Sequence, residues 1–186
     1  MDSQGLKQGT QGPKPRLATI WLGGCSGCHM SFLDMDERLI DLALRVDLCS
    51  SPLVDVKEFP NVDVTLVEGA VANEAHVHEL EIVRARSRIV VAFGDCAVTG
   101  NVTAMRNAFG VEDVLTRAYR STSAVVVGIP DGSDGMVPRL LPRVRPLHEL
   151  VKVDYFLQGC PPSADEIYTF LNELLEGRTP TIRRFG

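Results

Sequence analysis

Residues 17–28 read L-A-T-I-W-L-G-G-C-S-G-C, and this stretch decides the fold. Its apolar run, Leu17–Leu22, is short and closed by glycine, which is typical of a buried parallel strand. Two further runs, Ile89–Phe93 and Val153–Leu157, are also followed by glycine and then cysteine. In an open α/β sheet, the segments that follow parallel strands gather at one edge. We therefore expect the cysteines after these three strands to be neighbours in space.

Strand-like and helix-like segments alternate along the rest of the chain. This alternation predicts an α/β fold with a flavodoxin-like, doubly wound parallel sheet. Ser163 and Glu166 form a capping-box pattern that marks the start of the last helix, and Gly177 marks its end. The expected strands are 17–22, 45–49, 62–67, 89–93 and 153–157; the expected helices are 31–44, one containing Val77, Leu80 and Val83, one from Asn101, and one containing Ile167, Phe170, Leu171, Leu174 and Leu175.

The sequence predicts one folded domain, residues 16–186, after a flexible N-terminal tail, residues 1–15. The tail is rich in Gln, Gly, Lys and Pro. Residues 110–150 contain many glycines and prolines, and we expect mostly loop there, with one strand at 124–129. A loop of that length in a compact domain is usually functional or covered by a partner.

Composition narrows the classes of function. The 186-residue chain has a net charge of −5, which argues against nucleic-acid binding. No apolar stretch is long enough to span a bilayer, and the N-terminus lacks a secretory or twin-arginine leader. These features predict a cytoplasmic protein. Structural disulfides are rare in the cytoplasm, so the five cysteines point to metal or redox chemistry.

Four of the cysteines follow expected strands: Cys25, Cys28, Cys96 and Cys160. Four thiolates at one crevice predict a metal centre, and a cubane iron–sulfur cluster needs such a set. A thioredoxin-like redox motif would explain the C-x-x-C pair but not the other two. A structural zinc usually takes two close pairs, and buried free cysteine is the third alternative. Cys49 lies within a strand without flanking glycines, and we expect it to be no ligand.

Ordered motifs in the chain resemble those of the small subunits of NiFe hydrogenases. They are W-L-G-G-C-S-G-C-H-M-S-F-L-D at residues 21–34, V-E-G-A-V at 67–71, G-D-C-A at 94–97 and Q-G-C-P-P-S at 158–163. The respiratory complex I relative has adjacent cysteines in its first motif, so C-S-G-C argues against that subunit. The short chain without further cysteine pairs resembles the cytoplasmic, bidirectional, NAD-reducing type.

The resemblance implies that Cys25, Cys28, Cys96 and Cys160 bind the 4Fe-4S cluster nearest the NiFe centre. The resemblance also implies that this NiFe centre lies on a separate large subunit. The electrons would then pass to a diaphorase, which contains flavin and iron–sulfur clusters and reduces NAD. This chain would then carry no complete catalytic centre. An iron–sulfur scaffold or quinone-oxidoreductase-like subunit without a hydrogenase partner is the alternative.

Several other residues have open roles. Many relatives place Glu where this chain has His29, which is either a titrating group or a plain surface or packing residue. Glu68 follows an expected strand and points toward the cysteine crevice or to solvent. The group of His148, Arg143 and Arg145 is a candidate for facing the large subunit or the cluster. FMN is a weaker expectation, because the C-x-x-C occupies the loop that would bind its phosphate.

Overall fold

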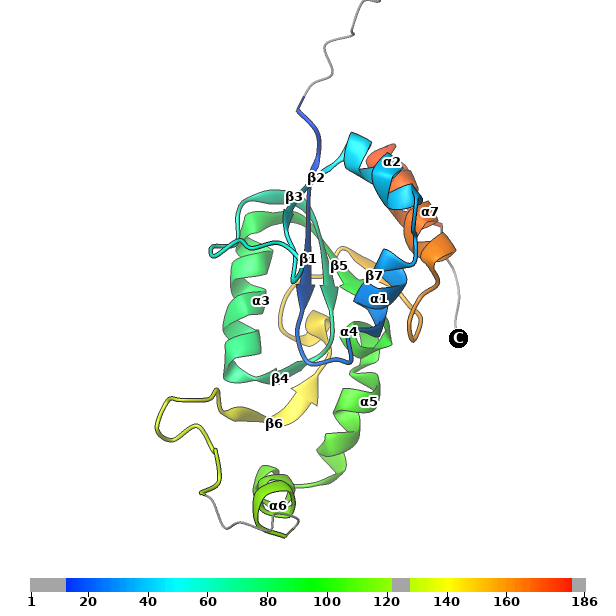
Figure 1. Ribbon diagram of the computed structural model, residues 1–186. Coiled ribbons are helices and arrows are strands. Elements are labelled where there is room, and N and C mark those ends of the chain that lie inside the picture. Colours follow the sequence, from blue (N-terminus) through cyan, green and yellow to red (C-terminus); the bar gives the residue numbers. More distant parts are fainter. Residues whose placement is uncertain (1–12, 122–127, 182–186) are drawn as a thin grey trace, which may run out of the picture.

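The computed structural model describes residues 13–121 and 128–181. Its centre is a five-stranded parallel sheet with the order β2-β1-β3-β5-β7 (Figure 1). This is the flavodoxin-like strand order, so the predicted fold class is confirmed. The strands are β1 (Arg16–Trp21), β2 (Asp47–Ser50), β3 (Val62–Glu68), β5 (Ser87–Phe93) and β7 (Tyr155–Leu157).

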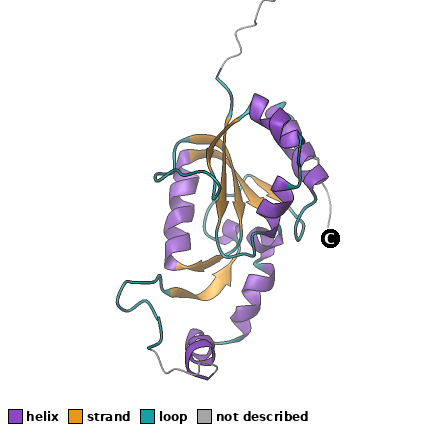
Figure 2. Ribbon diagram, in the orientation of Figure 1, coloured by secondary structure: helices purple, strands orange, loops and turns teal. Residues whose placement is uncertain are grey.

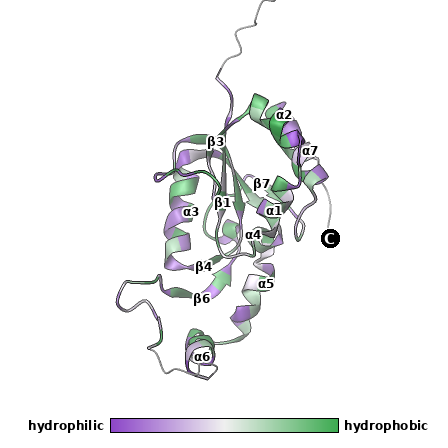
Figure 3. Cartoon of the chain, in the orientation of Figure 1, coloured by the Kyte–Doolittle hydropathy of each residue, from purple (hydrophilic) through white to green (hydrophobic). Residues whose placement is uncertain are grey.

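Helices cover both faces of the sheet, as expected for crossover connections (Figures 1 and 2). One face packs against α1 (Gly27–Leu33), α2 (Arg38–Arg45) and α7 (Ala164–Leu175). The other packs against α3 (Glu74–Arg86), α4 (Asp95–Thr99) and the 3-10 turn η3 (Leu147–Glu149). Figure 3 shows both hydrophobic and hydrophilic segments along α3, whose Leu80 and Val83 are buried against the sheet.

The expected helix 31–44 is wrong as a single element. The chain forms α1 and α2 with a break between them, because Asp36 adopts a left-handed φ of 51°. Met35, just before the break, is buried in the core. The expected helix from Asn101 is preceded by α4 and consists of α5 (Asn101–Ala104) and the 3-10 turn η1 (Met105–Ala108).

Residues 110–150 contain more regular structure than their prolines predict. α6 (Val111–Thr116) and the π-helical turn η2 (Arg117–Ser121) come first. β6 (Leu140–Arg145) then pairs antiparallel with β4 (Val71–Asn73) as a separate two-stranded sheet. Pro142 is tolerated in β6 because a strand of such a ribbon has an unpaired edge. Most of the expected strand 124–129 lies outside the described residues.

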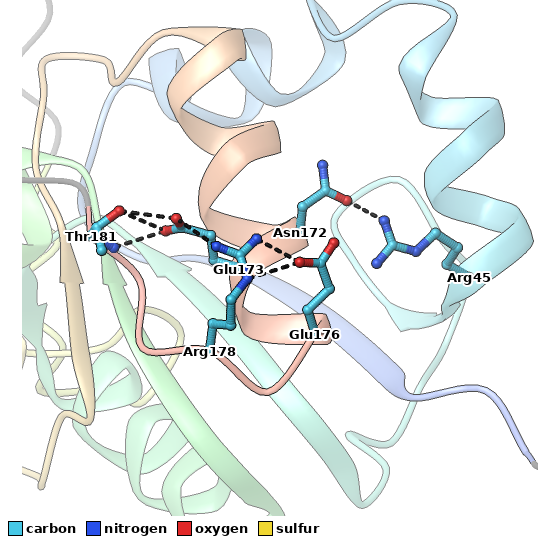
Figure 4. Close-up of polar contacts among 6 residues, drawn as sticks. All are labelled: Arg45, Asn172, Glu173, Glu176, Arg178 and Thr181. Carbon is cyan, nitrogen blue, oxygen red and sulfur yellow. Dashed lines mark hydrogen bonds and ion pairs between the residues drawn. The ribbon is translucent and has the colours of Figure 1, made fainter.

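Polar contacts fasten the C-terminal end of α7. The helix begins with the predicted capping box of Ser163 and Glu166. Near its end, the buried Glu173 accepts a hydrogen bond from the backbone N–H of Thr181 at 2.8 Å. Figure 4 shows this contact within a group of six residues: Arg45, Asn172, Glu173, Glu176, Arg178 and Thr181. Because Arg45 belongs to α2, these contacts hold α2, α7 and the segment after α7 together.

No helix within the described parts of the chain has both the length and the apolar character needed to cross a membrane. Of the expected tail, residues 1–12 lie outside the described residues. Lys14 and Pro15 contact the folded body: Lys14 donates a hydrogen bond to the carbonyl of Ala43 at 2.8 Å, and the carbonyl of Pro15 accepts one from Asp47 at 3.0 Å.

Candidate metal centre at the carboxyl edge of the sheet

The C-x-x-C loop follows β1 and runs directly into α1. Cys25 is exposed, whereas Cys28, in the first turn of α1, is buried. Ser26 between them has a left-handed φ of 65°, which turns the chain into the helix. The backbone N–H of Leu22 donates to the carbonyl of Glu68 at 2.8 Å, and Gly23 pairs with Ala70. The loop is therefore held against the end of β3.

Glu68 lies beneath this loop and is almost fully buried. Its carboxylate accepts hydrogen bonds from the backbone N–H groups of Cys28 at 3.3 Å and His29 at 3.0 Å. It also pairs with the ring Nδ1 of His29. Of the two open alternatives for Glu68, the solvated carboxylate is wrong. His29 is likewise a buried residue, and its Nε2 has no hydrogen-bond partner among residues 13–121 and 128–181.

The Cys96 and Cys160 loops are fastened to each other. The backbone N–H of Gly94 donates to the carbonyl of Leu157 at 2.7 Å. Asp95 donates from its backbone to the carbonyl of Gly159 at 2.9 Å, and its carboxylate accepts the Gly159 N–H at 2.8 Å. These reciprocal bonds fix the position of Cys160 relative to Cys96. Cys160 is exposed, and Cys96 is partly buried.

Gly94 has no side chain, and this leaves room for the sulfur of Cys28. Gly94 has a φ of 83°, and a Cβ atom there would lie 2.2 Å from the sulfur of Cys28. Only glycine fits both the backbone conformation and the contact. A third connection comes from α1, where the Ser31 hydroxyl donates to the carbonyl of Pro162 at 2.5 Å. The loops after β1, β5 and β7 are thus linked pairwise around Cys28.

Burial and neighbouring groups shift the pKa of two of the four thiols. Burial raises the pKa of Cys28, and the negative charges of Glu68, Cys96, Cys25 and Cys160 raise it further. Burial also raises the pKa of Cys96, with smaller contributions from Cys160 and Cys25. The structure therefore places the four cysteines that the sequence singled out on three connected loops at one edge of the sheet. It leaves Cys49 on β2, where the sulfur accepts a hydrogen bond from Nε of Arg16 at 3.2 Å.

Among residues 13–121 and 128–181, no three His, Cys, Asp or Glu side chains are grouped as ligands of a single metal ion. Thiolates that bind a cubane cluster each bind a different iron, so they need not converge on one point. Sequence reasoning missed two polar neighbours of the thiols. Nδ2 of Asn101 lies 3.2 Å from the sulfur of Cys160, and a polar interaction with Thr103 lowers the pKa of Cys96. Both residues belong to α5, and no motif in the sequence indicates that α5 lies next to the cysteines.

In the group of His148, Arg143 and Arg145, the side chains of Arg145 and His148 contact nearby residues. Nε of Arg145 donates to the carboxylate of Glu149 at 2.9 Å. The His148 ring packs edge-on against Phe156, with 5.9 Å between the ring centroids. Arg143 is exposed on β6. No hydrogen bond or ion pair links these three side chains to the cysteines within the described part of the chain, so their suggested role stays a prediction.

Comparison with known proteins places this architecture in a family. A model of the family described as NADH ubiquinone oxidoreductase, 20 Kd subunit, matches residues 25–174. The delta subunit of the NAD-reducing hydrogenase HoxS from Cupriavidus necator is 44% identical over 170 residues, covering 89% of this chain and 80% of that protein. A vhu subunit of the F420-non-reducing hydrogenase from Methanococcus voltae is 39% identical, covering 91% of this chain but only 59% of that protein.

Solved structures agree with these relatives. A chain of an NAD+-reducing [NiFe]-hydrogenase in the H2-reduced state superposes with a TM-score of 0.86 at 45% identity, covering 91% of this chain and 96% of that one. A chain of the [NiFeSe]-hydrogenase from Desulfomicrobium baculatum matches with a TM-score of 0.57 at 16% identity, covering 94% and 68%, and supports the fold alone. This chain therefore belongs to the NADH ubiquinone oxidoreductase 20 kDa subunit family and, within it, to the group of NiFe hydrogenase small subunits.

Proposed function

We propose that this chain is the electron-transfer subunit of a NiFe hydrogenase and holds a 4Fe-4S cluster on Cys25, Cys28, Cys96 and Cys160. The observation that carries the proposal is the placement of the four cysteines on three separate loops that are hydrogen-bonded to one another at one edge of the sheet. The cluster, when bound, supplies a one-electron carrier between the partner's NiFe centre and the next acceptor.

The residues present fit such a group. Cys28 is buried next to the Glu68 carboxylate, and both effects disfavour its thiolate in the isolated chain. Thiolate coordination to iron reverses that balance, because the metal's positive charge stabilises the ionised sulfur. Glu68 holds the backbone of Cys28, and Gly94 leaves room for its sulfur. The chain's own task is to fix the four thiols, limit water around Cys28 and set the local charge.

The proposed direct partner is a large subunit that carries the NiFe centre. Exposed apolar side chains support a docking surface beside the cysteines, since Trp21 ends the strand before the C-x-x-C, Met30 lies in α1, and Val102 and Met105 follow on α5 and η1. Large apolar side chains in this arrangement are typical of protein interfaces. A flavin- and cluster-containing diaphorase that reduces NAD is the proposed further partner, in a cytoplasmic complex.

Replacement of one cysteine, with Cys49 as the matched control, tests the cluster. The complex isolated through this chain should contain nickel and flavin, and it should lose iron and sulfide equivalent to one cubane in Cys160→Ala but not in Cys49→Ala. H2-dependent NAD reduction should fall to background only in Cys160→Ala. Full retention of iron, sulfide and NAD reduction in Cys160→Ala would contradict the proposal.

A second candidate is an iron–sulfur subunit that works without a hydrogenase partner, as the name of the matching family allows. Co-purification separates the two functions. A nickel-containing large subunit isolated with this chain supports the hydrogenase, whereas a cluster-loaded chain with no nickel partner supports the second candidate. Flavin bound to the isolated chain would indicate an FMN site on the chain itself.

A further inference from the structure

Asn101 stands at an unusual backbone position beside the proposed cluster. Gly100 and Asn101 both have positive φ values, 86° and 35°, where the chain turns from α4 into α5. Asparagine tolerates this conformation better than most residues. The turn directs the Asn101 side chain to Cys160, 59 positions away, with Nδ2 at 3.2 Å from the sulfur.

Thr103 fixes this turn to the other side of the site. Its hydroxyl donates a hydrogen bond to the carbonyl of Gly23, next to the C-x-x-C pair, at 2.9 Å. A polar interaction with Thr103 also lowers the pKa of Cys96. The α5 turn, which follows α4 and Cys96 along the chain, is therefore anchored to the loop after β1. This leaves the amide of Asn101 in a fixed position against the third loop, which carries Cys160.

We propose that Asn101 sets the reduction potential of the cluster by donating a side-chain N–H to the sulfur of Cys160. The inference rests on the proposed function, because it requires Cys160 to be a cluster ligand. Reduction adds one negative charge that spreads over the iron and sulfur atoms. A donor on a ligand sulfur stabilises the more negative state and raises the potential.

Asn101 acts through Cys160 and is a positioning residue, not a catalytic one. In the isolated chain the sulfur of Cys160 is exposed, so water competes with the amide for its lone pairs. A partner that covers this edge removes the water and makes the amide contact electrostatically stronger. The effect is therefore to be measured in the assembled complex.

Two substitutions separate the amide's role from that of the backbone. Asn101→Gly keeps a residue suited to positive φ and removes the donor, so it relieves strain instead of adding it. Asn101→Asp has nearly the same shape, removes the donor and adds a negative charge near the sulfur. Asn107→Ala is the matched control, because Asn107 lies on η1 and its amide bonds the backbone of Val144, away from the cysteines.

The test is a redox titration of the holo-complex followed by electron paramagnetic resonance. At a fixed ambient potential, the ratio of reduced to oxidised cluster should fall severalfold in Asn101→Gly and further in Asn101→Asp. A tenfold fall corresponds to a shift of about 59 mV for a one-electron couple. Asn107→Ala should leave the ratio unchanged, even if it lowers the melting temperature.

The outcomes distinguish this inference from the proposed function. A fully loaded cluster whose potential is unchanged in both Asn101 variants would overturn the role of Asn101 and leave the cluster proposal standing. Equal shifts in Asn107→Ala and Asn101→Gly would also overturn it, because they would show a general response to loosening of the segment. A wild-type complex without iron and sulfide would overturn the proposed function and this inference with it.

Discussion

The carboxylate of Glu68 accepts a hydrogen bond from the backbone N–H of His29 at 3.0 Å, across 39 positions of sequence. The same carboxylate accepts the N–H of Cys28 and pairs with the His29 ring. One side chain at the end of β3 thus accepts two backbone N–H groups from the first turn of α1 and pairs with the His29 ring. Such a buried acceptor is costly to remove, because each donor left without a partner loses its solvation as well.

Glu68→Ala should therefore lower the free energy of unfolding of the cluster-free chain by on the order of 3 kcal/mol. Urea unfolding followed by circular dichroism measures this change. The control is Glu81→Ala, which removes an exposed carboxylate from α3 and should change stability by less than about 0.5 kcal/mol. Equal stability of the two variants would mean that Glu68 does not anchor the loop.

Gly94→Ala should destabilise the chain and displace Cys28. Alanine at a φ of 83° costs about 1–3 kcal/mol, and its Cβ would lie 2.2 Å from the Cys28 sulfur. Gly135→Ala is the matched control, because Gly135 has a φ of 75° but no atom of the described residues lies within 4 Å of the added Cβ. Thermal unfolding should show a larger loss for Gly94→Ala. Losses of the same size would indicate that only backbone strain matters at Gly94.

The sequence predicted the parts of this site that depend on strand ends. Short apolar runs closed by glycine indicated β1, β5 and β7. The cysteines after them lie at one edge of the sheet because the carboxyl ends of parallel strands share that edge. The roles of Glu68 and Asn101 depend instead on how loops fold over that edge. In the sequence, Glu68 is a carboxylate at the end of a strand, a position where many carboxylates are solvated. Asn101 contacts Cys160 only because the chain turns at positive φ just before α5. No periodic pattern of residues in the sequence indicates the contacts of Glu68 or of Asn101.

The two-stranded β4–β6 sheet was missed for a related reason. β4 is three residues long, and β6 contains Pro142, so neither segment shows the alternation expected of a strand. Their pairing becomes favourable only when Val71 and Val144 are buried against the main body. Tertiary packing here overrides the local preference of the sequence.

The four thiols should differ in reactivity in the cluster-free chain. Burial and nearby negative charge raise the pKa of Cys28, so its reactive thiolate is scarce at neutral pH. Cys25 and Cys160 are exposed. Alkylation with iodoacetamide at pH 7.5, read by peptide mass spectrometry, should therefore modify Cys25 and Cys160 well before Cys28. The urea-unfolded chain is the control, and its cysteines should react at similar rates.

Asp154 should make stability depend on pH in the acidic range. Burial raises the pKa of this carboxyl, but hydrogen bonds from Arg84 and the Val90 backbone, at 2.6 and 2.9 Å, lower it by more, so the folded-state value lies below the ordinary one of about 3.9. A depressed pKa means that the ionised form stabilises the folded state. This contribution is fully present above about pH 5, and it is lost as the pH falls through the folded-state pKa.

Asp154→Asn removes this titration, so its stability should fall less steeply below pH 4 than that of the unmodified chain. At pH 7 the variant should be the less stable of the two, because Arg84 loses its ionic partner. Urea unfolding midpoints between pH 2.5 and pH 7 measure both effects, with Asp55→Asn, an exposed carboxyl far from β7, as the control. Parallel pH profiles for Asp154→Asn and the unmodified chain would mean that the Arg84 pair does not stabilise the strand that leads to Cys160.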